Sequence, residues 1–575
     1  MYKTIFSKVG EYKKQAVLAP ITIVGEVIME VTIPMVMSKI IDNGIKAGKI
    51  SYVAGMGLLM VAMALLSLCF GALAGRFSAV AAMGFAKNLR NALFHKVQDF
   101  SFSNVDKFST ASLTTRLTTD VTNVQNAFMM FIRTAFRAPI MLISATVMAI
   151  CIKPNLAVVF LFAIPVLGTA LFFIVTNAHP RFEKMLKQYD GMNARVQENL
   201  TGIRVVKAFV REEHEKKLFT ENTDKVRRAQ VFAEKLVILN MPIMQIVVYA
   251  CIVAILWFGG NMAVEGNLQT GQLSSFIMYV GQILMSLMML SMLFIMFVIS
   301  RASMQRIYEV LSEEPSIADP ENAEVSAKDG SVSFKNVSFS YFGDMNNLAL
   351  EKIDLDIKSG ETIGIIGGTG SSKSSLVQLI PRLYDATEGD VIVGGHNVRE
   401  YSLETLRNQV AMVLQKNVLF SGTIKENLRW GDENASDEDI VEACKDACAH
   451  DFIMNFPDGY DTDLGQGGVN VSGGQKQRLC IARALLKKPK IIILDDSTSA
   501  VDTATDSSIR KAFREKLSET TTFIIAQRIS SVQDADRIIV MDDGKISAIG
   551  THDELMKTNA IYREVYDSQQ KGADE

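Results

Sequence analysis

The chain has 575 residues, more than one hydrophobic core usually serves, so we expect two or more domains. It is 49% hydrophobic with a formal net charge of -3, and no basic patch is interleaved with aromatic residues, which argues against nucleic acid as a partner. Its six cysteines form no C-x-x-C pair, which argues against a disulfide framework or a zinc site.

Long apolar segments crowd the N-terminal half of the chain. A helix needs about 20 residues to cross a bilayer with roughly 30 Å of hydrocarbon. Six segments are long enough, at about 16–41, 54–83, 127–152, 155–178, 236–262 and 273–300. The basic N-terminus is followed by an apolar stretch without a small-residue cleavage site, so we expect it to be retained as an anchor. These patterns predict a membrane domain of six helices.

The connections between the predicted spans differ in charge. Segment 181–235 is dense in Lys and Arg, whereas loop 260–272 contains neither. Cytoplasmic loops carry the excess of positive charge in membrane proteins. We therefore expect a multi-pass protein of the cell membrane, with its N-terminus and its soluble half in the cytoplasm.

Ionisable residues inside the spans need a reason to be there, because a charge in lipid costs at least ~2.5 kcal/mol. Glu26 and Glu30 are one helical turn apart and share a face. They could attract cationic substrates into a cavity, but hydrogen bonding to a neighbouring helix is the role we favour. Arg133 and Arg137 lie near one end of the third span, where we expect both side chains to reach the lipid headgroups.

The sixth span repeats methionine at helical spacing. Flexible thioethers suit a surface that adapts to varied apolar ligands, although helix packing is the commoner role of such a stripe and the one we favour. The candidate substrate cavity consists of the two glutamates and this stripe, Met285, Met289, Met292 and Met296.

The second half of the chain turns to short β-rich runs, which predicts a membrane domain at 1–314, a linker at 315–328 and a nucleotide-binding domain at 329–575. Segment 361–376, ETIGIIGGTGSSKSSL, reads as a strand, a Gly-rich turn and a helix start, the context that a phosphate-binding loop requires. Backbone N–H groups of such a loop point at nucleotide phosphates. The candidate nucleotide-binding residues are Gly367, Gly368, Thr369, Gly370, Ser371, Ser372, Lys373, Ser374 and Ser375.

Within this loop, Lys373 would reach the β- and γ-phosphates and the Ser374 hydroxyl would ligate Mg²⁺. Ser372 stands where the motif has glycine. If its position requires a left-handed backbone, serine strains the loop by about 1–3 kcal/mol.

Two further segments complete the nucleotide chemistry. The apolar strand in 490–502, KIIILDDSTSAVD, ends in carboxylates and delivers Asp495 to the Mg²⁺ coordination sphere. Ser472, Gly473 and Gly474 open a helix whose N-terminus is also suited to phosphate. One nucleotide cannot use two distant helix starts of the same domain, so the second one is expected to serve a nucleotide held by another subunit.

Together these motifs resemble the half-transporters of the ATP-binding cassette (ABC) exporter family over essentially the whole chain. The resemblance implies a type IV exporter-like chain in two parts: an all-α six-helix transmembrane domain, then an α/β P-loop nucleotide-binding domain that uses ATP and Mg²⁺. Segments 102–121 and 196–213 resemble the cytoplasmic extensions that couple the two parts. The implied roles are adenine stacking for Tyr341, the Q-loop glutamine and metal ligand for Gln415, the signature motif acting in trans for Ser472, Gly473, Gly474 and Gln475, and the D-loop for Asp502.

The chain departs from its family at one site. Asp496 replaces the usual catalytic glutamate and is one methylene shorter, and a misplacement of about 1 Å can cost about 10²-fold in rate. Gln527 replaces the usual switch histidine, and glutamine cannot relay a proton. With Ser372, these changes predict a site that binds ATP but hydrolyses it weakly or not at all.

The signature motif, in contrast, is intact. The chain therefore resembles the degenerate-site subunit of bacterial heterodimeric multidrug exporters, a likeness that extends to 136–143 and to 464–475 with Gln466. We expect a second, non-identical half-transporter as partner, membrane lipids around the spans, and small apolar or amphipathic compounds, including cationic ones, as substrates. A homodimeric lipid or drug exporter with slow turnover and a nucleotide-gated channel or regulator are the alternatives; the absence of a regulatory insertion weighs against the last.

Overall fold

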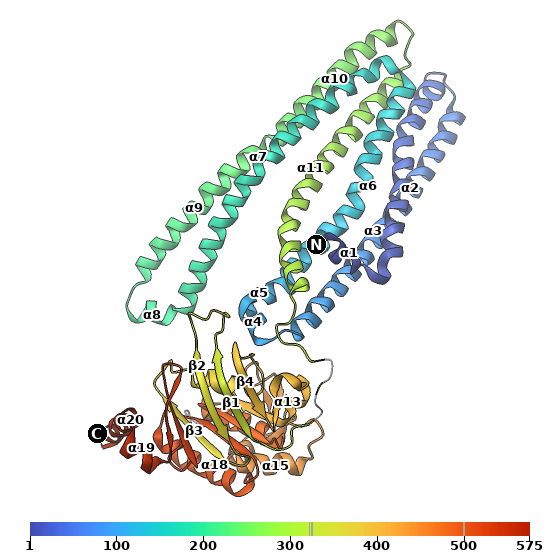
Figure 1. Ribbon diagram of the computed structural model, residues 1–575. Helices are drawn as coiled ribbons and strands as arrows, with labels where there is room; N and C mark the ends of the chain where they lie inside the picture. The colour runs from blue at the N-terminus through green and yellow to red at the C-terminus, as the bar shows by residue number, and fades with distance from the viewer. Residues whose placement is uncertain (321–322, 324–325, 498–500, 575) are drawn as a thin grey trace. The chain divides into compact units, whose positions relative to one another are not determined.

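The computed structural model describes residues 1–320, 323, 326–497 and 501–574 (Figure 1). The chain divides into two compact units, a membrane unit of Met1–Gln98 with Phe108–Glu313 and a soluble unit of Asp99–Lys107 with Glu314–Glu575. The short segment Asp99–Lys107 thus groups with the soluble unit, although the sequence pattern assigns it to the membrane domain.

The membrane unit is entirely helical where the structure describes it. Its long helices are α2 (Lys13–Lys39), α3 (Ile50–Gln98), α6 (Val121–Ile152), α7 (Pro154–Thr201), α9 (Glu212–Ile238), α10 (Asn240–Val264) and α11 (Thr270–Ser312). Its short helices are α1 (Tyr2–Ser7), α5 (Thr110–Thr115) and α8 (Ile203–Ala208), whereas α4 (Phe102–Phe108) lies almost wholly in the segment that groups with the soluble unit. Six helical stretches of the described residues are long and apolar enough to cross a membrane, as the hydropathy pattern predicts.

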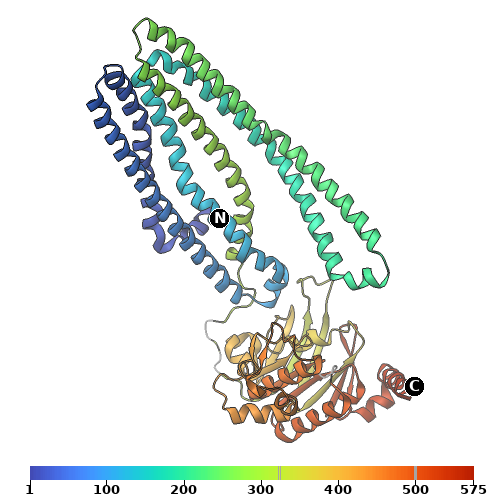
Figure 2. The ribbon, with the colours of Figure 1, turned by 180° about the vertical axis from the view of Figure 1, so that it is seen from behind.

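Several helices are much longer than the membrane is thick. α3 has 49 residues and α7 has 48, which at 1.5 Å per residue makes each more than about 70 Å long. In both views α7 runs beside α9 and α10, which follow one another along a single line (Figure 2). These helices therefore continue well beyond about 30 Å of hydrocarbon.

A proline in α2 determines how this helix meets α11. Pro34 has no N–H, so the carbonyl of Glu30 loses its partner within the helix. Gln282 Nε2 donates to this carbonyl at 3.2 Å, and Tyr279 Oη donates to the next carbonyl, that of Val31, at 2.9 Å. Side chains of α11 thus satisfy the backbone groups around the proline, as a chain in lipid requires.

The described residues of the soluble unit form three sheets, of which the smallest pairs β7 (Gly422–Thr423) with β8 (Asp463–Leu464). The four-stranded sheet has the order β2-β1-β4-β5, and the six-stranded sheet has the order β12-β11-β3-β10-β9-β6. The strands of these two sheets are β1 (Val332–Phe339), β2 (Leu350–Ile357), β3 (Thr362–Gly367), β4 (Glu388–Val393), β5 (His396–Asn397), β6 (Val410–Val413), β9 (Ile491–Asp495), β10 (Thr521–Ile525), β11 (Arg537–Asp542) and β12 (Lys545–Gly550). In the larger sheet β11, β3, β10, β9 and β6 are parallel.

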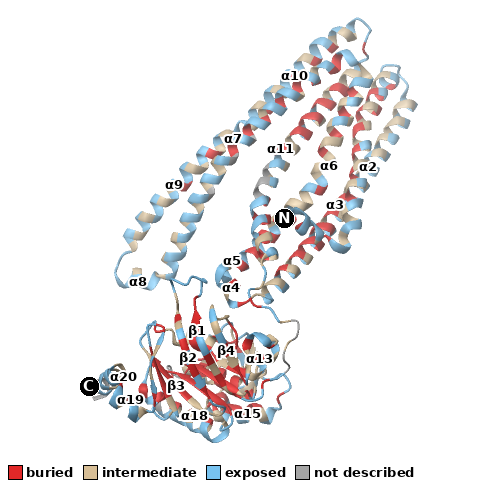
Figure 3. Ribbon diagram, in the orientation of Figure 1, coloured by how far each residue is buried: buried red, intermediate tan, exposed pale blue. Residues whose placement is uncertain are grey.

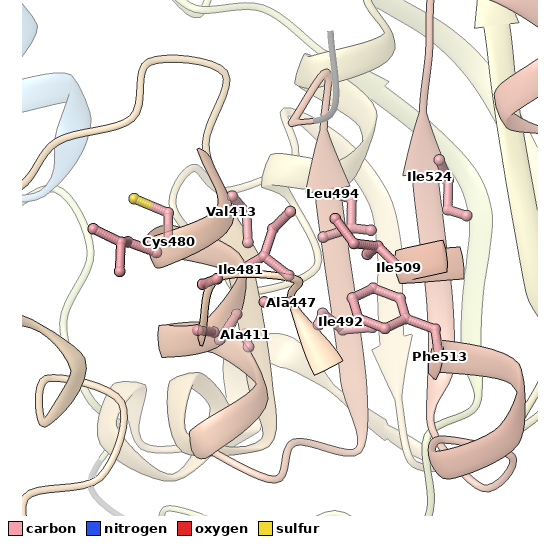
Figure 4. Close-up of a cluster of buried hydrophobic side chains, with 14 of the residues drawn as sticks. Ala411, Val413, Ala447, Cys480, Ile481, Ile492, Leu494, Ile509, Phe513 and Ile524 are labelled. Carbon is pink, nitrogen blue, oxygen red and sulfur yellow. The ribbon is translucent and has the colours of Figure 1, made fainter. Parts of the chain in front are cut away.

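Helices of the soluble unit cover this larger sheet, and its central strands β9 and β10 are buried from end to end (Figure 3). The helices are α12 (Lys373–Gln378), α13 (Leu403–Gln409), α14 (Ile424–Leu428), α15 (Asp437–Asp446), α16 (His450–Met454), α17 (Gly473–Leu486), α18 (Thr503–Lys516), α19 (His552–Thr558) and α20 (Ala560–Asp574). Figure 4 shows Ile481 of α17, Ile509 and Phe513 of α18 and Ile492 and Leu494 of β9 in one core. The α/β P-loop fold that the sequence predicts is confirmed.

The strand order brings the candidate site together. β10 lies between β3 and β9, so the carboxyl ends of these three parallel strands share one edge of the sheet. Gly367 ends β3, Asp495 ends β9 and Ile525 ends β10. Ligands of open α/β sheets bind outside this edge.

Candidate nucleotide site

The phosphate loop connects β3 to α12 through left-handed backbone. Gly370 has φ +84°, and Ser372, directly before α12, has φ +66° and ψ +27°. Ser372 thus adopts the left-handed conformation that glycine tolerates best, and a serine at this position strains the loop. A Cβ atom at Gly367 would lie 2.3 Å from the carbonyl oxygen of Met541, so the loop also needs glycine where it leaves the sheet.

Lys373 curls over the loop. Its Nζ donates to the carbonyl oxygens of Gly367 at 2.9 Å and Gly368 at 2.8 Å. Burial lowers the pKa of Lys373, partly offset by the carboxylates of Asp495 and Asp496. A phosphate group beside the ammonium would favour its charged form.

Ser374 and Asp495 meet at the position expected for a metal. Ser374 Oγ donates to Asp495 Oδ1 at 2.8 Å, and Asp495 is only 3% exposed. Burial raises the pKa of Asp495, as does the charge of Asp496, while the Ser374 hydroxyl acts in the opposite direction. A bound cation would reverse this shift.

These oxygens fit Mg²⁺. Across the described residues, no cluster of three or more His, Cys, Asp or Glu side chains could hold a metal ion by itself. Mg²⁺ commonly binds through one or two protein oxygens together with nucleotide phosphates, and a hydroxyl next to a carboxylate supplies such ligands. Ser374 and Asp495 would hold the ion, and the ion would neutralise charge on the phosphates.

The two residues expected to replace the family's catalytic pair are hydrogen bonded to each other. Gln527 Nε2 donates to Asp496 Oδ2 at 2.8 Å, and Gln415 Nε2 lies 3.5 Å from the same oxygen. Asp496 follows β9 with φ +48°, and its N–H donates to the carbonyl of Ile525 in β10 at 3.0 Å. Residues from three segments, which the sequence predicts to act together, are thus gathered around one carboxylate.

Tyr341 lies against the phosphate-loop helix. Its hydroxyl is 2.8 Å from Ser375 Oγ, and its ring meets that of Tyr384 edge-on, with centroids 5.2 Å apart. Tyr341 remains exposed, so one face of its ring can stack on a base. The sequence motifs do not indicate Tyr384, whose hydroxyl donates to Asp106 Oδ2 at 2.7 Å. For the hydrogen bond between Tyr384 and Asp106, the sequence signal is the resemblance of segment 102–121 to a coupling extension.

The signature segment forms a capped helix start. Ser472 Oγ accepts from Gln475 N at 3.3 Å, and Gln475 Oε1 accepts from Ser472 N at 2.9 Å. Gly473 and Gly474 follow the Ser472 cap of this reciprocal capping box, so the first two residues of α17 have no side chain. Asp502 caps α18 in a similar way, accepting from Thr505 N at 3.0 Å.

In the membrane unit the two glutamates share one arginine. Arg137 of α6 forms ion pairs with Glu26 and Glu30 of α2, the second with an Nη2–Oε2 distance of 2.7 Å. A Cβ atom at Gly71 of α3 would lie 3.0 Å from Glu26 Oε1, so the glycine leaves room for the carboxylate. The glutamates therefore bond to a neighbouring helix, as we favoured, whereas Arg137 does not reach for the headgroups, because two carboxylates lie within reach.

The methionine stripe is only partly covered by the chain's own helices. Met285 and Met292 are 56% and 55% exposed, and Met289 and Met296 are partly exposed. The buried face of α11 is instead formed by residues such as Tyr279, Ile283 and Leu287. Met285 and Met292 therefore lie on the exposed side of α11.

A six-helix membrane unit joined to a P-loop domain with a second, capped helix start defines an ATP-dependent membrane transporter. Residues 17–288 match the ABC transporter transmembrane region, and residues 350–499 match the ABC transporter domain. The chain is 39% identical to YfiB of Bacillus subtilis, an uncharacterized ABC transporter ATP-binding protein, over 97% of both chains. The chain belongs to the ABC transporter family and is a half-transporter of the exporter type.

A named exporter and a solved exporter structure are also similar to this chain. The chain is 34% identical to YgaD of Bacillus subtilis, provisionally named a multidrug export ATP-binding/permease protein, over 83% of each chain. Its fold is similar to that of a bacterial Atm1-family ABC exporter with ATP bound, with a TM-score of 0.84 and 25% identity over 97% of this chain and 98% of that one. The nucleotide-binding domain of such a transporter binds ATP, typically with Mg²⁺.

Proposed function

We propose that the chain is one subunit of a heterodimeric, ATP-driven exporter of apolar or amphipathic compounds. Its own site holds ATP and Mg²⁺ but hydrolyses ATP weakly or not at all, and Ser472–Gln475 completes the hydrolytic site of a non-identical partner subunit. The protein lies in the cell membrane with its N-terminus and nucleotide-binding domain in the cytoplasm. The membrane domain at 1–314, the linker at 315–328 and the nucleotide-binding domain at 329–575 are the working parts of this subunit.

The observation that carries the proposal is the hydrogen bond from Gln527 to Asp496. A general base must reach the proton that it removes and must have a lone pair to receive it. Asp496 is shorter than glutamate, and its Oδ2 accepts the amide of Gln527 at 2.8 Å, with that of Gln415 at 3.5 Å. An amide cannot take up or relay a proton. This arrangement supports a site that holds ATP.

The intact signature helix supports a partner of different sequence. In a homodimer, both composite sites would contain Asp496 and Gln527, and the assembly would turn over slowly. The capped start of α17 would then serve a site that cannot use it. With a partner that has the usual glutamate and histidine, the retained motif would complete a site that can hydrolyse ATP.

The turn after α8 supports the coupling role proposed for segment 196–213. Phe209 and Val210 are 73% and 80% exposed, although both are large and apolar. Val210 also has φ +51°, which is costly for a β-branched residue and is retained mainly where function requires it. Docking of this turn against a partner would bury both side chains.

The membrane unit supports amphipathic substrates with positive charge. When ionised, Glu26 and Glu30 carry two negative charges against the single positive charge of Arg137. The exposed Met285 and Met292 offer polarisable, adaptable surface on α11. A cationic compound with an apolar body suits both features.

ATPase measurements on the chain alone and with its co-purifying partner test the proposal. We expect negligible turnover by the chain alone and full turnover by the pair. In the pair, Ser472→Ala should lower turnover by about 10²-fold, because a group that stabilises transition-state charge at the partner's site is lost. Asp496→Ala should leave most of the activity, and it serves as the matched comparison because it alters only this chain's own site.

The outcomes separate the alternatives. Appreciable turnover by the chain alone that disappears in Asp496→Ala would favour a homodimer. Turnover of the pair that is unaffected by Ser472→Ala would show that the assignment of roles is wrong. Accumulation of a fluorescent amphipathic cation against its gradient in vesicles distinguishes an exporter from a nucleotide-gated channel.

A further inference from the structure

The last helix of the soluble unit is tied to the segment that carries Gln527. We call residues 527–531, which follow β10, the switch segment. Gln569 of α20 accepts the N–H of Ile529 with its Oε1 at 2.9 Å and donates to the carbonyl of Gln527 with its Nε2 at 2.7 Å. One side-chain amide thus binds two backbone groups of the switch segment.

The switch segment needs these partners because it has left the sheet. β10 ends at Ile525, and the N–H of Ala526 still donates to Ile365 of β3 at 3.2 Å. Backbone groups beyond that point require hydrogen bonds from elsewhere. A glutamine amide has both the donor and the acceptor of a peptide group, so Gln569 takes the place of a neighbouring strand.

The position of Gln569 is itself fixed by packing. Tyr562, Tyr566 and Gln569 are spaced i, i+4 and i+7 and therefore share one face of α20. Tyr562 is fully buried, and its hydroxyl lies 2.8 Å from Nδ1 of His552. Ile529 belongs to the same hydrophobic core as Tyr562. The helix and the switch segment thus rest on common packing, and Gln569 joins them by hydrogen bonds.

We propose that Gln569 is a positioning residue for the nucleotide site: it fixes the backbone from which Gln527 reaches Asp496, and α20 thereby slows the release of ATP. The inference rests on the proposed function, in which this site holds ATP. Gln527 reaches Asp496 over 2.8 Å, so a backbone shift on the order of 1 Å would break that bond. A switch segment without its clamp would sample such shifts and leave the nucleotide less enclosed.

The test compares variants of the full-length chain in complex with its co-purifying partner. Gln569→Met keeps the length and the packing of the side chain but removes both hydrogen bonds. Gln569→Glu keeps an acceptor for Ile529 and loses the donor to Gln527. Gln570→Ala changes the adjacent, exposed residue and is the control.

The first measurement is the release of radiolabelled ATP, loaded with Mg²⁺, after dilution into unlabelled ATP. Two hydrogen bonds of about 0.5–1 kcal/mol each predict release about five- to thirtyfold faster in Gln569→Met. Gln569→Glu should release ATP at least as fast, because its carboxylate faces the carbonyl of Gln527. Gln570→Ala should behave as the wild type.

The second measurement is amide hydrogen exchange in residues 527–531. Gln569→Met should raise the exchange of the Ile529 amide more than that of the amides in β10, a pattern that general destabilisation would not give. Wild-type release of ATP by Gln569→Met, or unchanged exchange at Ile529, would overturn the inference. Rapid release by the wild type would instead count against the proposed ATP-holding function, and the exchange data would still decide whether Gln569 positions the switch segment.

Discussion

Removal of Arg137 should destabilise the membrane unit more than removal of any exposed cation. Arg137 forms ion pairs with both Glu26 and Glu30, whose side chains are 13% and 36% exposed. Arg137→Met preserves the apolar length of the side chain but leaves two carboxylates without their partner. Breaking a buried ion pair in this way costs about 3–5 kcal/mol.

The structure places the expected loss at the lower end of that range. Glu30 is more than a third exposed, so its contribution is small, and Glu26 carries most of the effect. A loss of about 3 kcal/mol corresponds to a fall in melting temperature of roughly 5 °C for the roughly 300 residues of the membrane unit, at about 2 cal/mol/K of unfolding entropy per residue. Differential scanning fluorimetry of the purified complex in nanodiscs measures this fall.

Two further variants make the result decisive. Arg133→Met, one turn earlier on the exposed side of α6, should leave the melting temperature within about 1–2 °C of wild type. The triple variant Arg137→Met, Glu26→Gln, Glu30→Gln should recover most of the loss, because it removes the unpaired charges together with their partner. If Arg137→Met is as stable as the wild type, or if the triple variant is no more stable than the single one, the ion pairs do not stabilise the membrane unit.

Two predictions concern the nucleotide site. Ser372→Gly should raise the melting temperature of the nucleotide-binding domain by a few degrees, because it removes a left-handed serine that costs about 1–2 kcal/mol. ATP affinity in equilibrium titrations should change less than about threefold, and hydrolysis should not be restored. A large loss of affinity would show that the Ser372 hydroxyl binds the nucleotide. The second prediction concerns the double variant Asp496→Glu, Gln527→His, made in a Ser472→Ala background that silences the partner's site. It should raise ATPase activity at least about tenfold, since a misplaced base costs about 10²-fold in rate. Unchanged activity would mean that other residues make this site inactive.

The fold could be predicted from the sequence because its signals are local. Six apolar stretches give the spans, and a strand followed by a Gly-rich turn and a lysine gives the P-loop edge of the sheet. Local sequence signals do not predict contacts between residues that are far apart in the sequence. Asp99–Lys107 precedes a predicted span by only some twenty residues, yet it groups with the soluble unit, where Asp106 bonds to Tyr384.

The pairing of polar groups was the least predictable part of the site. Arg137 lies more than a hundred positions from Glu26, and nothing in the spacing of either residue indicates the other. Gln569 carries a signal that is visible in retrospect, a polar residue at i+7 on the face of α20 that also presents Tyr562. The burial of the methionines on α11 could not be predicted either, because their regular spacing is equally compatible with a buried and with an exposed face.

Asp496 and Gln527, the two residues expected to replace the family's catalytic pair, fit each other, which explains why both should be changed together. The left-handed backbone of Asp496 and its N–H bond to Ile525 fix the point from which its side chain starts. From there an aspartate meets the amide of Gln527 at 2.8 Å, whereas a glutamate would extend about 1.5 Å further and disturb this hydrogen bond. Asp496→Glu alone would leave an amide that relays no proton, and Gln527→His alone would leave a base that is too short. The gain from the pair should therefore exceed the sum of the single gains, and simple additivity would show that the two residues act independently.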